Sequence, residues 1–129
     1  MATKRRTSPY ELRFYDEPDG SEPVRDWIKE ELSAEVRRSL GAALREVLQE
    51  QGINVCGTPF GKQLGEGLFE FRLRETGLLF RVFCHAYGDK MILLLGAYDK
   101  GSDPSEKQQH AQIKIARGRL KEWQGRQKG

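Results

Sequence analysis

Hydrophobic and polar residues alternate most clearly between residues 68 and 98. Three apolar runs there are separated by two turn signals, Glu75-Thr76-Gly77 and Tyr87-Gly88-Asp89. Runs rich in β-branched, leucyl and aromatic residues with short glycine-containing breaks are typical of consecutive antiparallel strands. The pattern therefore predicts a three-stranded antiparallel meander at the centre of the fold.

The first two runs place arginine on one face of this predicted sheet. By the two-residue period, one face of the first run carries Glu70, Arg72 and Arg74, and the other face is apolar. Arg81 lies in the second run. A charge inside an apolar sheet is unfavourable unless it is exposed, paired or used, so the arginines are candidate functional residues. A purely structural role on a solvated face fits the same pattern.

A strand and two helices are predicted before the meander. Residues 10–15 alternate and predict a strand, and Pro23 stands at a preferred position for the start of a short helix. Ser33 is a cap for a second helix, which Gly52 ends. The apolar stripe of the second helix consists of Val36, Leu40, Ala43, Leu44, Val47 and Leu48. Residues 53–67 are punctuated by glycine and predict a loop that carries Lys62 towards the meander.

A last helix is predicted after the meander. Asp103-Pro104-Ser105-Glu106 matches a capping box, and the helix is expected to run to about Trp123. The residues expected to face the protein body are Ala111, Ile113, Ala116, Leu120 and Trp123. Its basic edge consists of Lys107, Lys114, Arg117 and Lys121. The pattern leaves open whether this helix packs on the sheet.

Composition indicates one globular domain, expected at residues 9–124 between a disordered basic tail (1–8) and a flexible tail (125–129). The chain has 129 residues, 37% hydrophobic and 32% charged, with a net charge of +3. No apolar run is long enough to span a bilayer, and the N-terminus lacks a secretion signal, so a cytoplasmic location is expected. Cys56 and Cys84 are expected to be separate thiols, and with only two histidines no metal site is expected.

Basic residues are concentrated at the C-terminal end. Residues 101–129 contain seven Lys or Arg side chains and three acidic ones. A basic patch favours a polyanion such as nucleic acid, or an acidic partner, although ordinary surfaces also carry such patches.

Four segments in this order resemble the toxins of the RelE/ParE superfamily, and most closely their HigB-type, phage-derived branch. They are Glu22-Pro23-Val24, Lys62 to Arg72, Leu79 to Phe83, and Leu93 to Lys100. The resemblance implies an α+β, RelE-like fold. An N-terminal strand and two helices would pack on a small antiparallel sheet of about four strands, followed by a C-terminal helix.

The resemblance also implies a function. Such proteins are toxins of type II toxin-antitoxin systems and are ribosome-dependent endoribonucleases that cleave messenger RNA and thereby inhibit translation. Cleavage needs no metal or other cofactor, because the neighbouring 2′-hydroxyl attacks the phosphate. The expected partners are a cognate antitoxin, of the small helix-turn-helix kind, and the ribosome with its messenger RNA. No membrane is involved.

The resemblance assigns candidate site residues. The catalytic candidates are Arg72, Arg81, Tyr98 and Lys100, and the RNA-binding candidates are Lys62, Arg74, Lys114, Arg117 and Lys121. Arginine suits a phosphate because its planar group pairs with two oxygens and stays charged. A phenol can stack on a base or assist proton transfer. The three residues on the last helix could instead contact an acidic antitoxin segment.

The chain departs from the HigB-type pattern at one position. That pattern has a histidine just after the tyrosine, whereas this chain has Asp99-Lys100. The identity of the general acid and base is therefore open. Two alternatives also stay open: a ParE-like, non-enzymatic topoisomerase inhibitor, and a non-toxic relative that binds RNA or protein.

Overall fold

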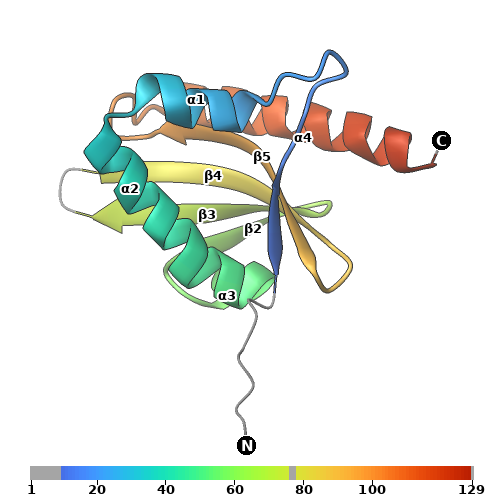
Figure 1. Ribbon diagram of the computed structural model, residues 1–129, viewed down its shortest axis with the longest axis horizontal. Helices are drawn as coiled ribbons and strands as arrows, with labels where there is room; N and C mark the ends of the chain where they lie inside the picture. Colours follow the sequence, from blue (N-terminus) through green and yellow to red (C-terminus); the bar gives the residue numbers. More distant parts are fainter. Residues whose placement is uncertain (1–9, 76–77, 129) are drawn as a thin grey trace, which may run out of the picture.

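A five-stranded mixed sheet forms the centre of the protein, as the computed structural model shows for residues 10–75 and 78–128 (Figure 1). The strand order is β1-β5-β4-β3-β2. The strands are β1 (Glu11–Phe14), β2 (Gly61–Gly65), β3 (Leu68–Glu75), β4 (Leu78–Tyr87) and β5 (Met91–Asp99). The helices are α1 (Pro23–Glu31), α2 (Ala34–Ala43), α3 (Gln49–Gln51) and α4 (Glu106–Lys128). A π-helical turn (Leu44–Leu48) joins α2 to α3, and a 3₁₀ segment (Gly52–Gly57) follows α3.

The predicted α+β architecture is confirmed, with two corrections to the sheet. The sheet has five strands rather than about four, because β2 forms inside the predicted loop 53–67 and pairs antiparallel with β3. It is also mixed rather than antiparallel, since β1 pairs parallel with β5, starting with Glu11 opposite Met91. The predicted meander of β3, β4 and β5 is antiparallel, as expected. The predicted tail at residues 1–8 lies outside the described residues.

Helix ends follow the predicted signals in the first half of the chain. Pro23 begins α1, and the Ser33 Oγ accepts a hydrogen bond from the Val36 N–H (3.2 Å) at the start of α2. Gly52 ends α3 with φ +55°, a conformation that glycine adopts without strain. The predicted capping box before α4 is wrong. Ser105, not Asp103, caps this helix through its Oγ, which accepts from the Gln108 N–H (3.1 Å), while Asp103 binds the Ser105 N–H.

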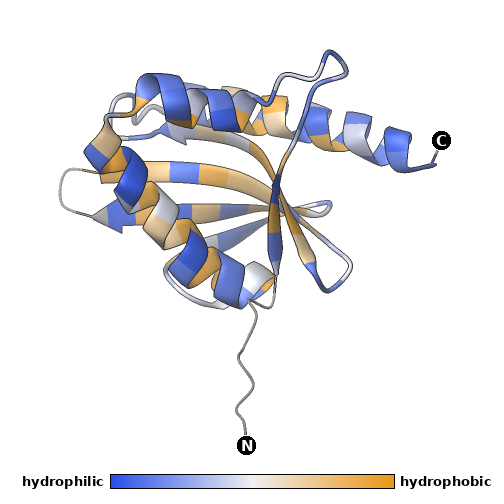
Figure 2. Cartoon of the chain, in the orientation of Figure 1, coloured by the Kyte–Doolittle hydropathy of each residue, from blue (hydrophilic) through white to orange (hydrophobic). Residues whose placement is uncertain are grey.

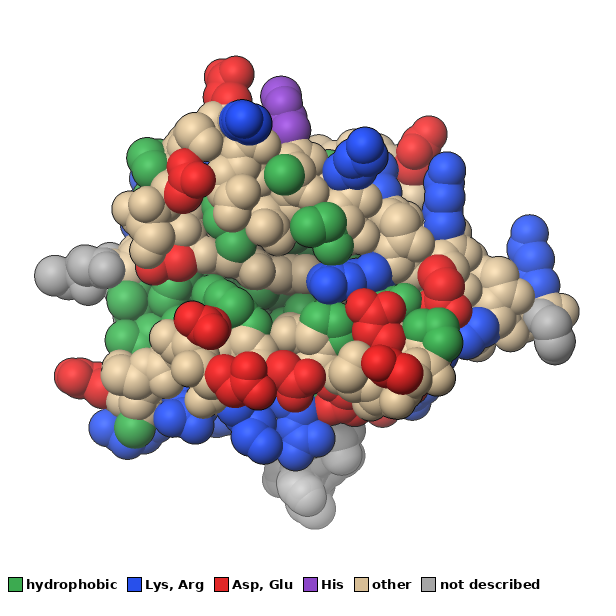
Figure 3. Space-filling model, turned by 90° about the horizontal axis from the view of Figure 1, so that it is seen from above, with side chains coloured by type: hydrophobic (Ala, Val, Ile, Leu, Met, Phe, Trp, Pro, Cys, Tyr) green, Lys and Arg blue, Asp and Glu red, His purple; other side chains and the backbone are tan. Residues whose placement is uncertain are grey.

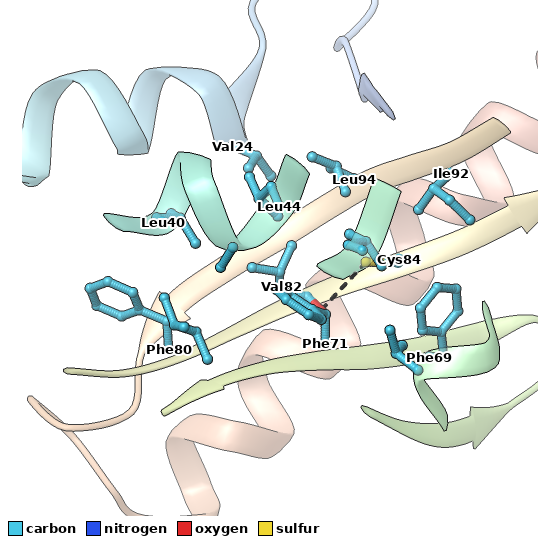
Figure 4. Close-up of a cluster of buried hydrophobic side chains, with 14 residues drawn as sticks. Val24, Leu40, Leu44, Phe69, Phe71, Phe80, Val82, Cys84, Ile92 and Leu94 are labelled. Carbon is cyan, nitrogen blue, oxygen red and sulfur yellow. Dashed lines mark hydrogen bonds between the residues drawn. The ribbon is translucent and has the colours of Figure 1, made fainter. Parts of the chain in front are cut away.

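Helices α1 and α2 cover one face of the sheet and form the larger core with it (Figures 1 and 2). Figure 4 shows Phe71, Val82 and Leu94 from three neighbouring strands in one cluster with Leu40 and Leu44. All five side chains are buried. The alternate residues of the same strands therefore point to the opposite face, where the arginines lie.

Helix α4 packs on that opposite face. Ala116, Leu120 and Trp123 are buried against it, which answers the question that the sequence left open. The helix continues to Lys128, past its predicted end near Trp123. Ala111 is exposed, so its predicted orientation towards the body is wrong. Within the described part of the chain, no helix has both the length and the apolar character that crossing a membrane requires.

Gly61 is the point at which β2 crosses closely over the 3₁₀ segment. A Cβ atom there would lie 2.7 Å from the backbone carbonyl of Val55, whereas a Cβ at Gly57 would meet nothing within 4 Å. We expect Gly61→Ala to lower the free energy of unfolding by about 1–3 kcal/mol, because overpacking displaces backbone. Gly57→Ala is the matched control and should change it by less than about 1 kcal/mol. Urea unfolding of both variants measures the difference, and equal values would contradict the close contact.

Candidate functional site

Three of the predicted catalytic side chains form one row across three strands. Arg72 on β3 is the register partner of Arg81 on β4, and Arg81 is in turn the partner of Tyr98 on β5. Directly opposed residues point to the same face with Cβ atoms about 4.5–5.5 Å apart. The antiparallel register thus brings together residues that the resemblance assigned separately. We call Arg72, Arg81 and Tyr98 the arginine row.

A buried carboxylate holds the two arginines of this row. Glu70 is fully buried, and its Oε2 lies 2.6 Å from the Arg72 Nε and 3.4 Å from the Arg81 Nε. The Arg81 side chain is 5% exposed, whereas that of Arg72 is 29% exposed. One negative charge therefore balances two positive ones, and Arg72 is the arginine of the pair that solvent reaches.

A hydrogen-bond chain connects this cluster to α4. The Gln109 Nε2 donates to the Glu70 Oε1 (3.5 Å), and the Gln109 Oε1 accepts from the Lys100 Nζ (3.0 Å). Gln109 lies in the first turns of α4, so this end of the helix covers the carboxylate. Lys100, a predicted catalytic residue, is therefore joined to the arginine row through Gln109 and Glu70.

Two polar atoms of the arginine row form no hydrogen bond with any residue that the structure describes. They are the Nε of Arg81 and the hydroxyl of Tyr98, both buried. Tyr98 stacks on Phe83 with a ring separation of 6.0 Å. Burial raises the pKa of the Tyr98 phenol, with Arg81 acting in the opposite direction, and burial lowers the pKa of Arg81, which Glu70 opposes. Tyr98 is therefore a neutral phenol whose hydroxyl has no partner within residues 10–75 and 78–128.

Two predicted RNA-binding residues flank the row. Lys62 on β2 is the register partner of Glu70, and Arg74 follows Arg72 on the same face of β3. Both are exposed. They extend a positive strip from the arginine row to the free edge of the sheet at β2.

The three predicted residues on α4 lie elsewhere, along the flank of the helix that faces the β2–β3 turn. Lys114, Arg117 and Lys121 line one shallow groove there, of about 510 Å³, with Glu66 opposite. The guanidinium of Arg117 donates to the carbonyls of Leu64 (2.6 Å) and Gly65 (3.0 Å). Arg117 thus fastens α4 to the turn, while Lys114 and Lys121 are exposed.

Two other polar residues on β4 and β5 have structural partners. The His85 Nδ1 lies 2.7 Å from the Gly67 carbonyl oxygen, and its ring meets that of Trp123 edge to face. His85 is thus engaged at the other end of α4 from Gln109. Asp99 accepts hydrogen bonds from the Gly101 N–H (2.9 Å) and the Ser102 hydroxyl (2.9 Å), which shape the exit from β5.

Glu70 and Gln109 are site residues that the sequence prediction missed. The two-residue period placed Glu70 on the same face as Arg72, so an acid two positions before an arginine in an apolar strand was an available signal. Gln109 had no such signal, because its position depends on how α4 docks.

The described residues contain no group of three or more His, Cys, Asp or Glu side chains placed to hold a metal ion. Cys56 is half-buried and Cys84 buried, and both are free thiols, as predicted.

A sheet with two N-terminal helices on one face and a C-terminal helix on the other is the α+β architecture of RelE-like toxins. The model of the phage-derived protein Gp49-like family matches residues 26–121. The chain belongs to this toxin-like family. No curated protein matches the chain.

Proposed function

We propose that this protein is the toxin of a type II toxin-antitoxin system, of the HigB type, and that it cleaves messenger RNA on the ribosome. The observation that carries the proposal is the arginine row: two guanidinium groups and a neutral phenol side by side on one face of the sheet. Family membership supports a toxin and, with it, an antitoxin partner.

The proposed reaction needs no metal. The 2′-oxygen loses its proton and attacks the adjacent phosphorus, the bond to the 5′-oxygen breaks, and that oxygen takes up a proton. The products are a 2′,3′-cyclic phosphate and a free 5′-hydroxyl. Positioned cations that stabilise the charge on the phosphate account for most of the acceleration in such a step.

The arginine row supplies these groups in the proposal. Arg72 is the partly exposed guanidinium that would contact the phosphate first. Arg81 would act from behind it, with its Nε in an ion pair with Glu70, and the Tyr98 hydroxyl could donate to the leaving oxygen or stack on a base. Lys100 would be the other proton-transfer candidate. Lys62 and Arg74 would hold the flanking phosphates.

One observation favours a different function. The ion pairs with Glu70 already satisfy part of the charge on Arg72 and Arg81, and α4 covers them through Gln109. A site of that kind also suits a protein with no chemistry of its own, such as a ParE-like topoisomerase inhibitor or an RNA- or protein-binding relative. RNA cleavage would require a phosphate to share or replace the Glu70 carboxylate.

Induction of the toxin in growing cells separates these functions. For the nuclease we expect translation to stop within minutes and new 5′ ends to appear inside translated codons, as mapped by primer extension. A topoisomerase inhibitor would instead induce the DNA-damage response with messenger RNA intact. Intact transcripts with no growth arrest would indicate a non-toxic protein that binds RNA or protein.

A further inference from the structure

The second half of β5 has an open edge. Strand β1 pairs with Met91 to Leu94 and ends there, with a last hydrogen bond from the Tyr15 N–H to the Leu94 carbonyl (3.0 Å). Beyond that point, residues 95–99 have β4 on one side and, in the described part of the chain, no strand on the other. An open edge of this kind is a template for another strand.

The backbone of this half-strand faces outward at alternate residues. The Lys100 N–H donates to the Leu79 carbonyl on the β4 side (2.8 Å). In an antiparallel pair the backbone groups of every second residue point away from the partner strand, so the N–H and C=O of Ala97 and the N–H of Asp99 point to the open side. The Arg119 guanidinium donates to the Leu95 carbonyl (2.8 Å). No side-chain or turn hydrogen bond of the described residues reaches the Ala97 amide or carbonyl.

This edge forms the floor of a groove between α1 and α4. The groove has a volume of about 530 Å³, and Figure 3 shows apolar side chains within it. Val24, Trp27 and Leu32 lie on the α1 side, and Ile115 of α4 lies on the other with 44% of its surface exposed. An extended segment lying here would meet apolar side chains on both walls.

The charged residues of the groove indicate what kind of partner it binds. Glu31 and Asp103 line it, are exposed, and form no ion pair with any residue of the described ranges. Among the described lining residues the one cation is Arg119, which donates to the Leu95 carbonyl and lies 3.7 Å from Glu17. Acidic side chains follow the α1 side of the groove in Figure 3. Such a rim repels nucleic acid and attracts a basic polypeptide.

We propose that this groove binds an extended, basic segment of the antitoxin, which adds as a strand to the free edge of β5. The identity of the partner rests on the proposed function. The edge is about 16 Å long, so about five residues of the segment pair with it. Its backbone bonds to Ala97 and Asp99, its apolar side chains contact Trp27, and a basic side chain pairs with Glu31.

The test uses the full chain and a synthetic peptide, acetyl-Arg-Val-Arg-Val-Arg-amide, followed by NMR of backbone amides. We expect the largest shifts at Ala97 and Asp99. Glu31→Lys should weaken binding about tenfold, because it places like charges together. Glu30→Lys is the matched control, since Glu30 is exposed on α1 outside the groove, and it should bind as the wild type does. A peptide with proline at its centre should also bind at least about tenfold more weakly, since it lacks one N–H.

Several results would overturn the proposal: no binding, shifts confined to other surfaces, or equal affinity for Glu31→Lys and wild type. Displacement of the peptide by an RNA oligonucleotide, or self-association of the free chain through this edge in sedimentation, would also do so. Arg72→Ala lies outside the groove and should bind the peptide normally. Failure of RNA cleavage and failure of peptide binding are therefore separate outcomes.

Discussion

Replacing Arg72 with alanine should abolish growth arrest and lower messenger RNA cleavage about 10²–10³-fold, the usual effect of removing one donor that stabilises a transition-state charge. Arg72 is the arginine of the row that reaches solvent, at 29% exposure, so its loss removes the first contact for a phosphate. Induced cells would be followed for growth and for new transcript 5′ ends.

The variant should fold, because Glu70 keeps its second partner, Arg81. Circular dichroism and urea unfolding check this. Arg38→Ala is the matched control: Arg38 is an exposed arginine on α2, on the opposite side of the sheet, and its removal should leave toxicity unchanged. A folded Arg72→Ala protein as toxic as the wild type would refute the nuclease assignment.

Removing the buried carboxylate should be the most destabilising single change in the site. We expect Glu70→Ala to lower the free energy of unfolding by about 3–5 kcal/mol, because it leaves Arg81 buried at 5% exposure without a counter-charge. It also removes the acceptor for Gln109 and so loosens the start of α4. Urea unfolding followed by tryptophan fluorescence measures the loss.

Glu11 provides the matched control, since it pairs with an arginine two residues later on a strand, as Glu70 does. The Glu11–Arg13 pair lies at 3.0 Å on the surface, with both side chains more than half exposed. Glu11→Ala should therefore cost less than about 1 kcal/mol. The double change Glu70→Leu with Arg81→Leu should recover most of the lost stability, because it removes both charges together. If Glu70→Ala proves as stable as wild type, the ion pairs contribute nothing to the fold.

The fold could be predicted where the sequence pattern is local. The meander and the start of α1 follow from periodicity, proline and short turns, and these act over a few residues. Strand β2 was missed because Gly61 and Gly65 look like loop residues. Gly61 has a tertiary purpose, since it allows β2 to cross the backbone of Val55, whereas Gly65 takes φ +92° beside a register shift in the β2–β3 pairing. The parallel pairing of Glu11 with Met91 likewise has no local signal.

The candidate site could be predicted in part for the same reason. Arg72 and Arg81 face each other because only two residues separate β3 from β4 in the sequence, which restricts the register of the two strands. Their pairing with Glu70 was not predicted. The alternation of residues along a strand shows on which face of the sheet a side chain lies, but not which rotamer that side chain adopts. The contact of Gln109 with Glu70 depends on the docking of α4, which rests on Ala116, Leu120 and Trp123. Their spacing indicates an apolar stripe but not its partner.

The parallel pairing of the first strand with the last has a consequence for synthesis. Strand β1 is synthesised long before β5. It therefore has no partner strand in the sheet until translation is almost complete. Long-range pairing of this kind also forms slowly, since a large loop must close first. The sheet is therefore completed only near the end of synthesis, after β5 has been made.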